Sequence, residues 1–148
     1  MSRDNQAIGA KFMQVDTQPR PVSKIALWTG RVLSTLAVLF LLFDCIIKLL
    51  QVPQAIEGTT TLGYPASVIF PLGVLQLICL IIYVIPQTSV LGAILWTGYL
   101  GGAIATHVRI GNPLFSHILF PVYVALLIWG GLYLRNQRLR ALMPLVRQ

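Results

Sequence analysis

Two oppositely charged side chains, Asp44 and Lys48, lie inside a long apolar segment of the sequence. Their spacing of four residues places both on one face of a helix, with the acid first, which is the favourable order for an ion pair. An unpaired charge at the centre of a bilayer costs at least about 2.5–3.5 kcal/mol. We therefore expect the pair to face protein, where it forms part of a substrate, quinone or ion site, or serves only as a structural polar lock.

Further polar residues lie at the ends of the other apolar segments. They are Glu57, His107, Arg109, Asn112 and His117. Helices that alternate in direction bring these residues to the same end of a bundle as Asp44 and Lys48, so we predict one polar cluster. Pro121 cannot bond the carbonyl of His117, which leaves that carbonyl free for another partner. Two histidines ten residues apart match no common zinc spacing, and no metal site is predicted.

The composition shows what kind of scaffold must position these residues. Only 10% of the 148 residues are charged, 56% are hydrophobic, and the mean hydropathy is +0.78. A soluble domain carries about 25% charged residues. Neither 58–108 nor 110–134 contains Lys, Arg, Asp or Glu. These stretches exclude a soluble enzyme, a disordered chain and a disulfide-stapled secreted domain, and they leave a small polytopic membrane protein.

Four membrane-spanning helices account for the apolar residues. Each predicted span is close to the ~20 residues that a helix needs to cross the bilayer. The segments are apolar on all sides rather than alternating, which favours helices over barrel strands. Breaker residues mark the connections at 54–65, 86–87 and 111–113. The predicted fold is an all-α bundle of residues 23–134, with spans at about 25–50, 66–85, 90–107 and 114–134.

The positive charges predict the orientation. The net charge is +7, and both tails are basic. An even number of spans puts both tails on one side, so the topology rule makes both termini cytoplasmic and the polar cluster external. The same rule explains the charge without nucleic acid as a partner. The tail 1–22 is predicted to be polar and disordered, and 135–148 to form a basic amphipathic stretch at the lipid interface.

Small residues recur at helical spacing in the third span. Gly98 and Gly102 lie on one stripe, and Gly101 and Ala105 lie on the next. This spacing lets helices approach closely, either within one bundle or between two copies of the chain. No nucleotide-binding, zinc-protease or serine-nucleophile motif occurs in the sequence, and no nucleophile–base pair is visible, so a non-catalytic role is favoured.

Several strings share their pattern with a known family. They are Leu42-Phe43-Asp44 followed by Lys48, Leu62-Gly63-Tyr64-Pro65, the run 92–109, and Trp129-Gly130-Gly131-Leu132-Tyr133. Together they resemble the DoxX-like family of small four-helix integral membrane proteins, over about residues 40–144. The resemblance implies a multi-pass protein of the bacterial cytoplasmic membrane. It also implies a link to membrane redox complexes, because the wider group is named for a subunit associated with thiosulfate:quinone oxidoreduction.

Two functions remain open on these grounds. The first is an accessory or quinone-interacting subunit of a membrane redox complex, with the quinone headgroup near Asp44, Lys48 and His107. Its partners would be the lipid bilayer and a membrane or redox protein, or a second copy of the chain. The alternative is a small transporter or proton-coupled permease that uses the same polar cluster.

Overall fold

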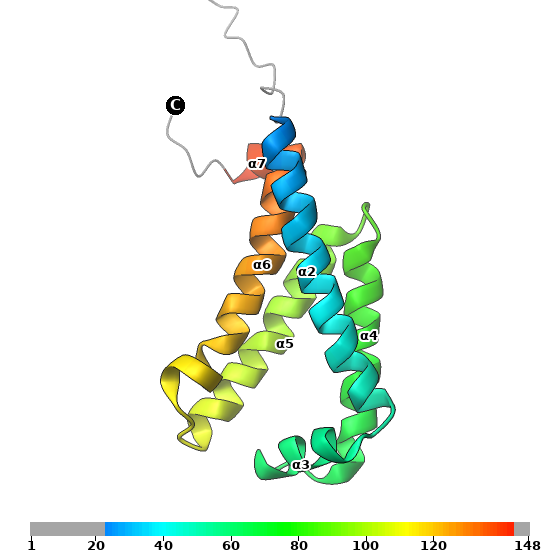
Figure 1. Ribbon diagram of the computed structural model, residues 1–148, viewed down its shortest axis with the longest axis vertical. Coiled ribbons are helices and arrows are strands. Elements are labelled where there is room, and N and C mark those ends of the chain that lie inside the picture. Colours follow the sequence, from blue (N-terminus) through cyan, green and yellow to red (C-terminus); the bar gives the residue numbers. More distant parts are fainter. Residues whose placement is uncertain (1–22, 144–148) are drawn as a thin grey trace, which may run out of the picture.

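The computed structural model describes residues 23–143, and every regular element in that range is a helix (Figure 1). The predicted tail 1–22 and the end of the second tail, 144–148, lie outside the described residues. The elements are α2 (Lys24–Leu49), α3 (Pro53–Thr61), the 3-10 turn η1 (Ala66–Val68), α4 (Ile69–Val84), α5 (Ser89–Arg109), the π-helical turn η2 (Leu114–Ile118), α6 (Phe120–Arg135) and α7 (Gln137–Leu142).

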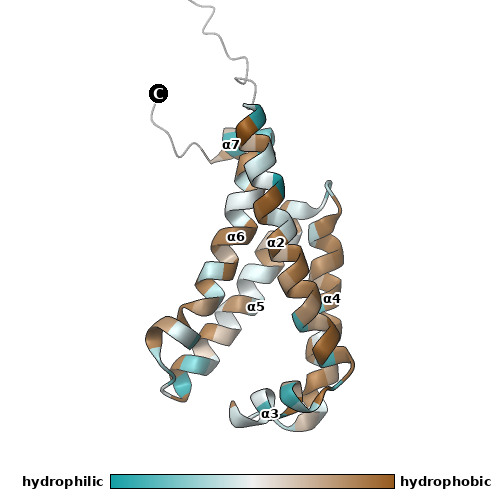
Figure 2. Ribbon diagram, in the orientation of Figure 1, coloured by the Kyte–Doolittle hydropathy of each residue, from teal (hydrophilic) through white to brown (hydrophobic). Residues whose placement is uncertain are grey.

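Four helical segments are long and apolar enough to cross a membrane. They are Lys24–Leu49, Ala66–Val84, Ser89–Arg109 and Leu114–Arg135, which confirms the predicted all-α fold with four spans. Large apolar side chains remain exposed on all four long helices. Figure 2 shows that hydrophobic residues, in brown, recur along these helices. Phe43 and Leu126 are each 64% exposed. Such a surface would be unstable in water and suits contact with lipid.

The four long helices pack in a ring. Helix α2 contacts α6 and α4, and α5 closes the ring by packing against α4 and α6. Trp96, Tyr83, Leu41, Ile128 and Leu132 fill the centre and are fully buried. The hydroxyl of Tyr83 donates to the carbonyl oxygen of Ile128 at 3.1 Å, so this buried polar group has a partner on another helix.

Two glycines allow the closest helix contacts. A Cβ atom at Gly92 on α5 would lie 2.4 Å from the backbone of Tyr83 on α4, and one at Gly131 on α6 would lie 2.5 Å from the hydroxyl oxygen of Ser34 on α2. The predicted packing residues Gly98, Gly101, Gly102 and Ala105 are instead exposed, and a Cβ at any of the three glycines would meet no atom within 4 Å. Packing inside this bundle therefore does not use that stripe.

The two ends of the bundle differ. Both ends of the described chain lie at one end, beside α7, where α2 and α6 project beyond the turn between α4 and α5 (Figure 1). We call this the basic end, after Lys24, Arg31, Arg135, Arg138 and Arg140. At the opposite end, which we call the α3 end, the pair α2–α4 diverges from the pair α5–α6, and α3 lies across the gap (Figure 1).

Helix α3 replaces the connecting loop that the breaker residues suggested. Pro53 lies in the first turn of α3. Backbone N–H groups there have no acceptor within the helix, so the lack of an N–H in proline costs no hydrogen bond. The hydroxyls of Thr59 and Thr60 donate to the carbonyls of Ala55 and Ile56, at 2.8 and 2.9 Å. These local bonds satisfy the threonine side chains within the helix, and Gly63, with a φ of +84°, then turns the chain towards α4.

Candidate functional site

The charged pair of α2 has the geometry that its spacing predicts. Lys48 donates to Asp44 in an i,i+4 ion pair, and the two side chains are 16% and 29% exposed. Within residues 23–143 this is the only ion pair. Each charge neutralises the other, which lowers the cost of placing both in an apolar span.

Gln76 on α4 completes this group, which we call the α2–α4 polar cluster (Asp44, Lys48 and Gln76). Its side chain is 1% exposed, and Nε2 donates to Oδ2 of Asp44 at 2.6 Å. Its Oε1 is buried without a hydrogen-bond partner among the described residues. A buried polar atom left without a partner costs about 1–3 kcal/mol, so this oxygen is an acceptor available to a ligand or a water molecule.

The two histidines meet at the α3 end. His107, at the end of α5, and His117, in η2, have ring centroids 5.7 Å apart and ring planes at 64°. The π-helical winding of η2 allows this approach. In η2 the backbone amide bonds to the carbonyl five residues earlier, and the amide of Leu119 donates to the carbonyl of Leu114 at 2.8 Å. Pro121 follows η2 and has no backbone N–H, so it cannot donate the ordinary helical hydrogen bond to the carbonyl of His117.

The neighbours of the imidazoles determine which nitrogens remain free. Nδ2 of Asn112 lies 2.7 Å from Nδ1 of His107, and Oγ of Ser116 lies 2.8 Å from Nδ1 of His117. An amide nitrogen only donates, so Nδ1 of His107 accepts and the proton of the neutral ring lies on Nε2. Ser116 can donate to Nδ1 of His117 or accept from it, so this bond allows either neutral tautomer of His117. His107 therefore presents an Nε2–H donor to a further partner, and His117 presents one when Ser116 is the donor.

A cavity of about 330 Å³ separates the histidines from α3. Its wall consists of Thr61, Leu62 and Gly58 on one side and His107, Ile110, Asn112 and His117 on the other. We call it the histidine cavity. It combines a few polar groups with apolar wall atoms, as small-molecule sites do, and its volume lies in their usual range of about 300–1,000 Å³.

Arg109 fastens α3 over this cavity. Its guanidinium donates to the carbonyl of Leu62 at 2.7 Å and lies 5.9 Å from the centre of the Tyr64 ring. The hydroxyl of Tyr64 in turn lies 2.9 Å from Oγ1 of Thr106 on α5. These contacts cross between chain segments more than forty residues apart, so Arg109 acts as a clamp between α3 and α5.

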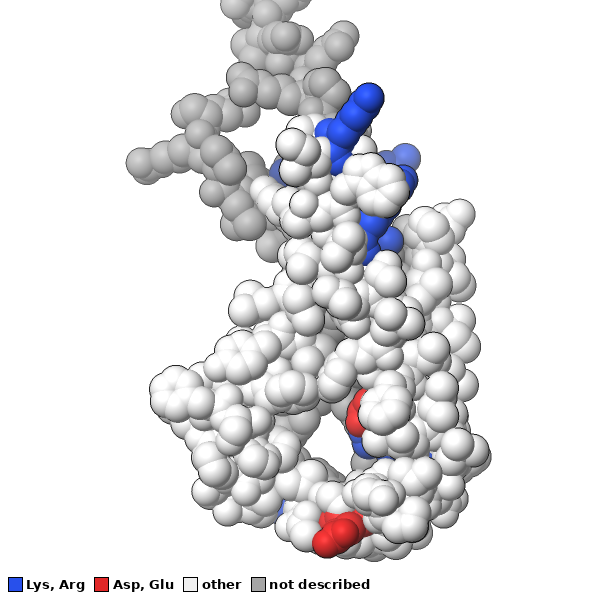
Figure 3. Space-filling view, viewed as in Figure 1, with Lys and Arg blue, Asp and Glu red and all other residues white. Residues whose placement is uncertain are grey.

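The seven predicted cluster residues thus divide into two groups and two single residues. Asp44 and Lys48 join Gln76 on the α2–α4 side, whereas His107, Asn112 and His117 line the histidine cavity. Arg109 forms the clamp, and Glu57 is exposed on α3. Figure 3 shows a hollow above α3 between the two sides, with charged atoms at its edge. Sequence reasoning did not assign Tyr64 and Ser116, because their roles depend on contacts made only when the helices pack.

No cluster suited to a metal ion occurs in residues 23–143. No group of three or more His, Cys, Asp or Glu side chains comes together there. Cys45 and Cys79 are both buried free thiols, and Sγ of Cys45 lies 3.3 Å from the carbonyl oxygen of Gly73. The cysteine on α2 thus helps to hold α4 beside the polar cluster.

The comparison with known families agrees with this architecture. The model of the DoxX-like family matches residues 32–131, which include all four spans in whole or in part. The chain belongs to the DoxX-like family. No curated protein and no solved structure matches it. For this DoxX-like protein, the match includes both the α2–α4 polar cluster and the histidine cavity and ends before Arg135 at the basic end.

Proposed function

We propose that this DoxX-like protein is an accessory subunit of a membrane redox complex and binds a quinone headgroup in the histidine cavity. The observation that supports the proposal is the pairing of His107 and His117 at the cavity wall. His107 presents an Nε2–H donor for a ligand carbonyl, and His117 presents a second when Ser116 donates to its Nδ1. A quinone carries two carbonyl acceptors on a small ring, and the resemblance connects the family with quinone-linked redox complexes.

The surroundings of the cavity suit a ligand that arrives from the bilayer. Phe115 and Leu114 in η2 are 74% and 52% exposed, and Ile110 at the cavity wall is 40% exposed. An isoprenoid tail could remain in lipid against these side chains while the ring occupies the cavity. The ion pair of Asp44 and Lys48 is not part of the cavity wall, so the proposed headgroup contacts come from the histidine side.

The proposed role also fixes an orientation. The basic end belongs on the cytoplasmic side by the positive-inside rule, in the bacterial cytoplasmic membrane, and the histidine cavity then opens near the external leaflet.

Photo-crosslinking tests the proposal. The full chain is reconstituted in lipid vesicles with a photoreactive benzoquinone analogue, and labelled peptides are mapped. We expect the label to concentrate in residues 107–117 and to fall about 3- to 10-fold in His117→Gln, the effect of losing one hydrogen bond. Gln137→Ala, an exposed change at the basic end, is the control. Equal labelling of all four spans, unchanged by His117→Gln, would exclude the site.

A second candidate, a small transporter, is favoured by one feature. The fourth span is discontinuous, since η2 and α6 are separate helical segments, and the first span carries an ion pair. Transporters often bind ions and substrates at such interrupted helices. Proton or solute flux into vesicles that requires Asp44 would support this function, and the absence of flux with wild-type protein would exclude it.

A further inference from the structure

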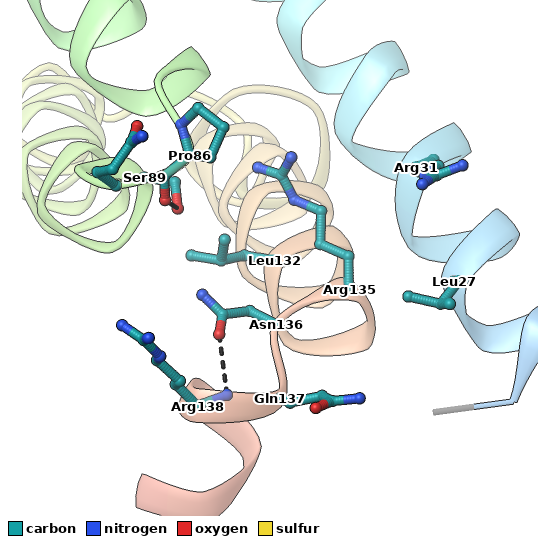
Figure 4. A pocket seen from close by; sticks show the side chains of 10 residues that line it. Leu27, Arg31, Pro86, Ser89, Leu132, Arg135, Asn136, Gln137 and Arg138 are labelled. Atoms are coloured by element: carbon teal, nitrogen blue, oxygen red, sulfur yellow. Dashed lines mark hydrogen bonds between the residues drawn. The ribbon is translucent and has the colours of Figure 1, made fainter. Parts of the chain in front are cut away.

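A second cavity lies at the basic end and has a volume of about 600 Å³ (Figure 4). Three arginines from three different helices line it: Arg31 on α2, Arg135 at the end of α6, and Arg138 on α7. Pro86, in the turn between α4 and α5, lines it as well. That turn ends the apolar spans, so the cavity lies at the level where lipid headgroups lie.

Three guanidinium groups around one cavity repel one another unless an anion lies between them. The two acids of residues 23–143, Asp44 and Glu57, lie on α2 and α3 in the other half of the molecule, and Figure 3 shows only basic atoms, and no acidic ones, at the basic end. The Nε atom of Arg135 is buried and has no hydrogen-bond partner within the described residues. The site therefore carries positive charge and an unused donor.

The fold holds these arginines in place through α7. Arg140 donates to the carbonyls of Tyr133 and Leu134, at 2.8 and 2.9 Å, and so ties α7 to the end of α6. The side chain of Asn136 accepts from the amide of Arg138 at 3.0 Å, which caps the first turn of α7 (Figure 4). Leu139 is 4% exposed in the bundle core. Helix α7 is thus docked on the protein, and it presents Arg138 to the cavity.

An adjoining groove indicates what kind of anion fits. A cavity of about 260 Å³ shares Arg31 and Arg135 with the larger one and continues past Thr35, Val38 and Leu39 of α2 to Val84 of α4. Leu39 and Val84 are 58% and 51% exposed, so this groove opens on the lipid-facing surface. A ligand with a charged head and an apolar chain matches the two cavities together.

We propose that the basic end binds an anionic phospholipid, with its phosphate among Arg31, Arg135 and Arg138 and one acyl chain in the groove between α2 and α4. Guanidinium groups bind phosphate through paired, charge-assisted hydrogen bonds. A free phosphate ion shares the headgroup chemistry but would leave the groove empty. This site is separate from the histidine cavity, and it does not depend on the quinone proposal.

The test measures retention of phosphatidylglycerol by the full chain. Protein purified in a mild neutral detergent is incubated with equal amounts of phosphatidylglycerol and phosphatidylcholine, and bound lipid is counted by native mass spectrometry. We expect one phosphatidylglycerol to be retained in preference to phosphatidylcholine. Arg31→Gln and Arg138→Gln should each lower its retention about 10-fold, the effect of losing a charge-assisted contact.

Two further variants locate the lipid. Lys24→Gln removes the same charge from the same end without touching the cavity, and it should change retention less than 2-fold. Thr35→Trp fills the groove without changing charge, and it should weaken phosphatidylglycerol binding, whereas 10 mM inorganic phosphate should not displace the lipid. Circular dichroism of each variant checks that the helices are intact.

Three results would overturn the proposal. Equal losses in Lys24→Gln and Arg138→Gln would show general charge attraction rather than a site. Equal retention of the two lipids would show no preference for an anion. Displacement by inorganic phosphate, together with an inert Thr35→Trp, would show a site for soluble phosphate instead of a lipid.

Discussion

At the scale of single residues, the chemistry of the α3 end depends on which polar atoms already have partners. Asp44 binds both Lys48 and Gln76, whereas Oε1 of Gln76 has no partner among the described residues. The spacing of Asp44 and Lys48 predicts their ion pair directly, because four residues make about one helical turn. The hydrogen bond from Gln76 to Asp44 forms only when α4 packs on α2. The spacing of residues along one helix does not predict that packing.

Breaking the ion pair on one side should destabilise the bundle. Lys48→Met leaves the carboxylate of Asp44 without its counter-charge, and we expect the free energy of unfolding to fall by about 1–3 kcal/mol. Asp44→Asn combined with Lys48→Met should recover most of that loss. Unfolding of the reconstituted chain in a denaturing detergent measures both values. Equal stability of the Lys48→Met single variant and the double variant would contradict the pairing.

At the scale of elements, glycine positions distinguish helix contacts from open surface. The sequence shows small residues at Gly92, Gly98, Gly102 and Gly131 alike, but only the contacts of each position reveal which of them touch a neighbour. The all-helical fold with four spans was easier to predict, because the absence of charge in 58–108 and 110–134 requires apolar spans. Helix α3 was not predicted. The hydroxyls of its threonines donate to carbonyls within the same helix, and the composition of the segment does not reveal these bonds.

Two alanine substitutions on α5 should therefore differ in sign. Gly92→Ala places a methyl group 2.4 Å from the backbone of Tyr83, so α4 and α5 must separate, and we expect a loss of about 1–3 kcal/mol. Gly98→Ala meets no atom within 4 Å and replaces a poor helix former, so stability should stay equal or rise slightly. Thermal unfolding in the same detergent compares them. A larger loss for Gly98→Ala would indicate a contact outside the single bundle.

Helix α7 should detach when its tie to α6 is removed. Arg140→Gln loses the bonds to the carbonyls of Tyr133 and Leu134, and we expect faster proteolysis within 136–143. Gln137→Ala, which changes an exposed residue on the same short helix, is the control and should be cleaved like the wild type. Similar cleavage rates for both variants would show that other contacts hold α7.

At the scale of the whole molecule, charge is separated along the bundle axis. The basic end holds five Lys and Arg side chains among residues 23–143, and both acids of that range lie on the other side of the molecule (Figure 3). The sequence predicts this separation, because charges can lie only where the apolar spans end or where they pair. The convergence of three arginines on one cavity was not predicted, since it depends on α7 folding back against α6.

The charge separation predicts sidedness in cells. Glu57→Cys at the α3 end should react with a membrane-impermeant maleimide in intact cells, whereas Gln137→Cys should react only after the membrane is opened. Both native cysteines are buried, which keeps the background labelling low. Labelling of Gln137→Cys in intact cells would reverse the proposed orientation and place the histidine cavity on the cytoplasmic side.

Equilibrium binding of a short-chain benzoquinone tests the proposed function most directly. The full chain is placed in lipid nanodiscs, and partitioning into empty nanodiscs is subtracted. The account predicts one saturable site whose dissociation constant rises about 3- to 10-fold in His117→Gln and stays unchanged in Gln137→Ala. Uptake equal to that of empty nanodiscs, or an unchanged dissociation constant in His117→Gln, would contradict it.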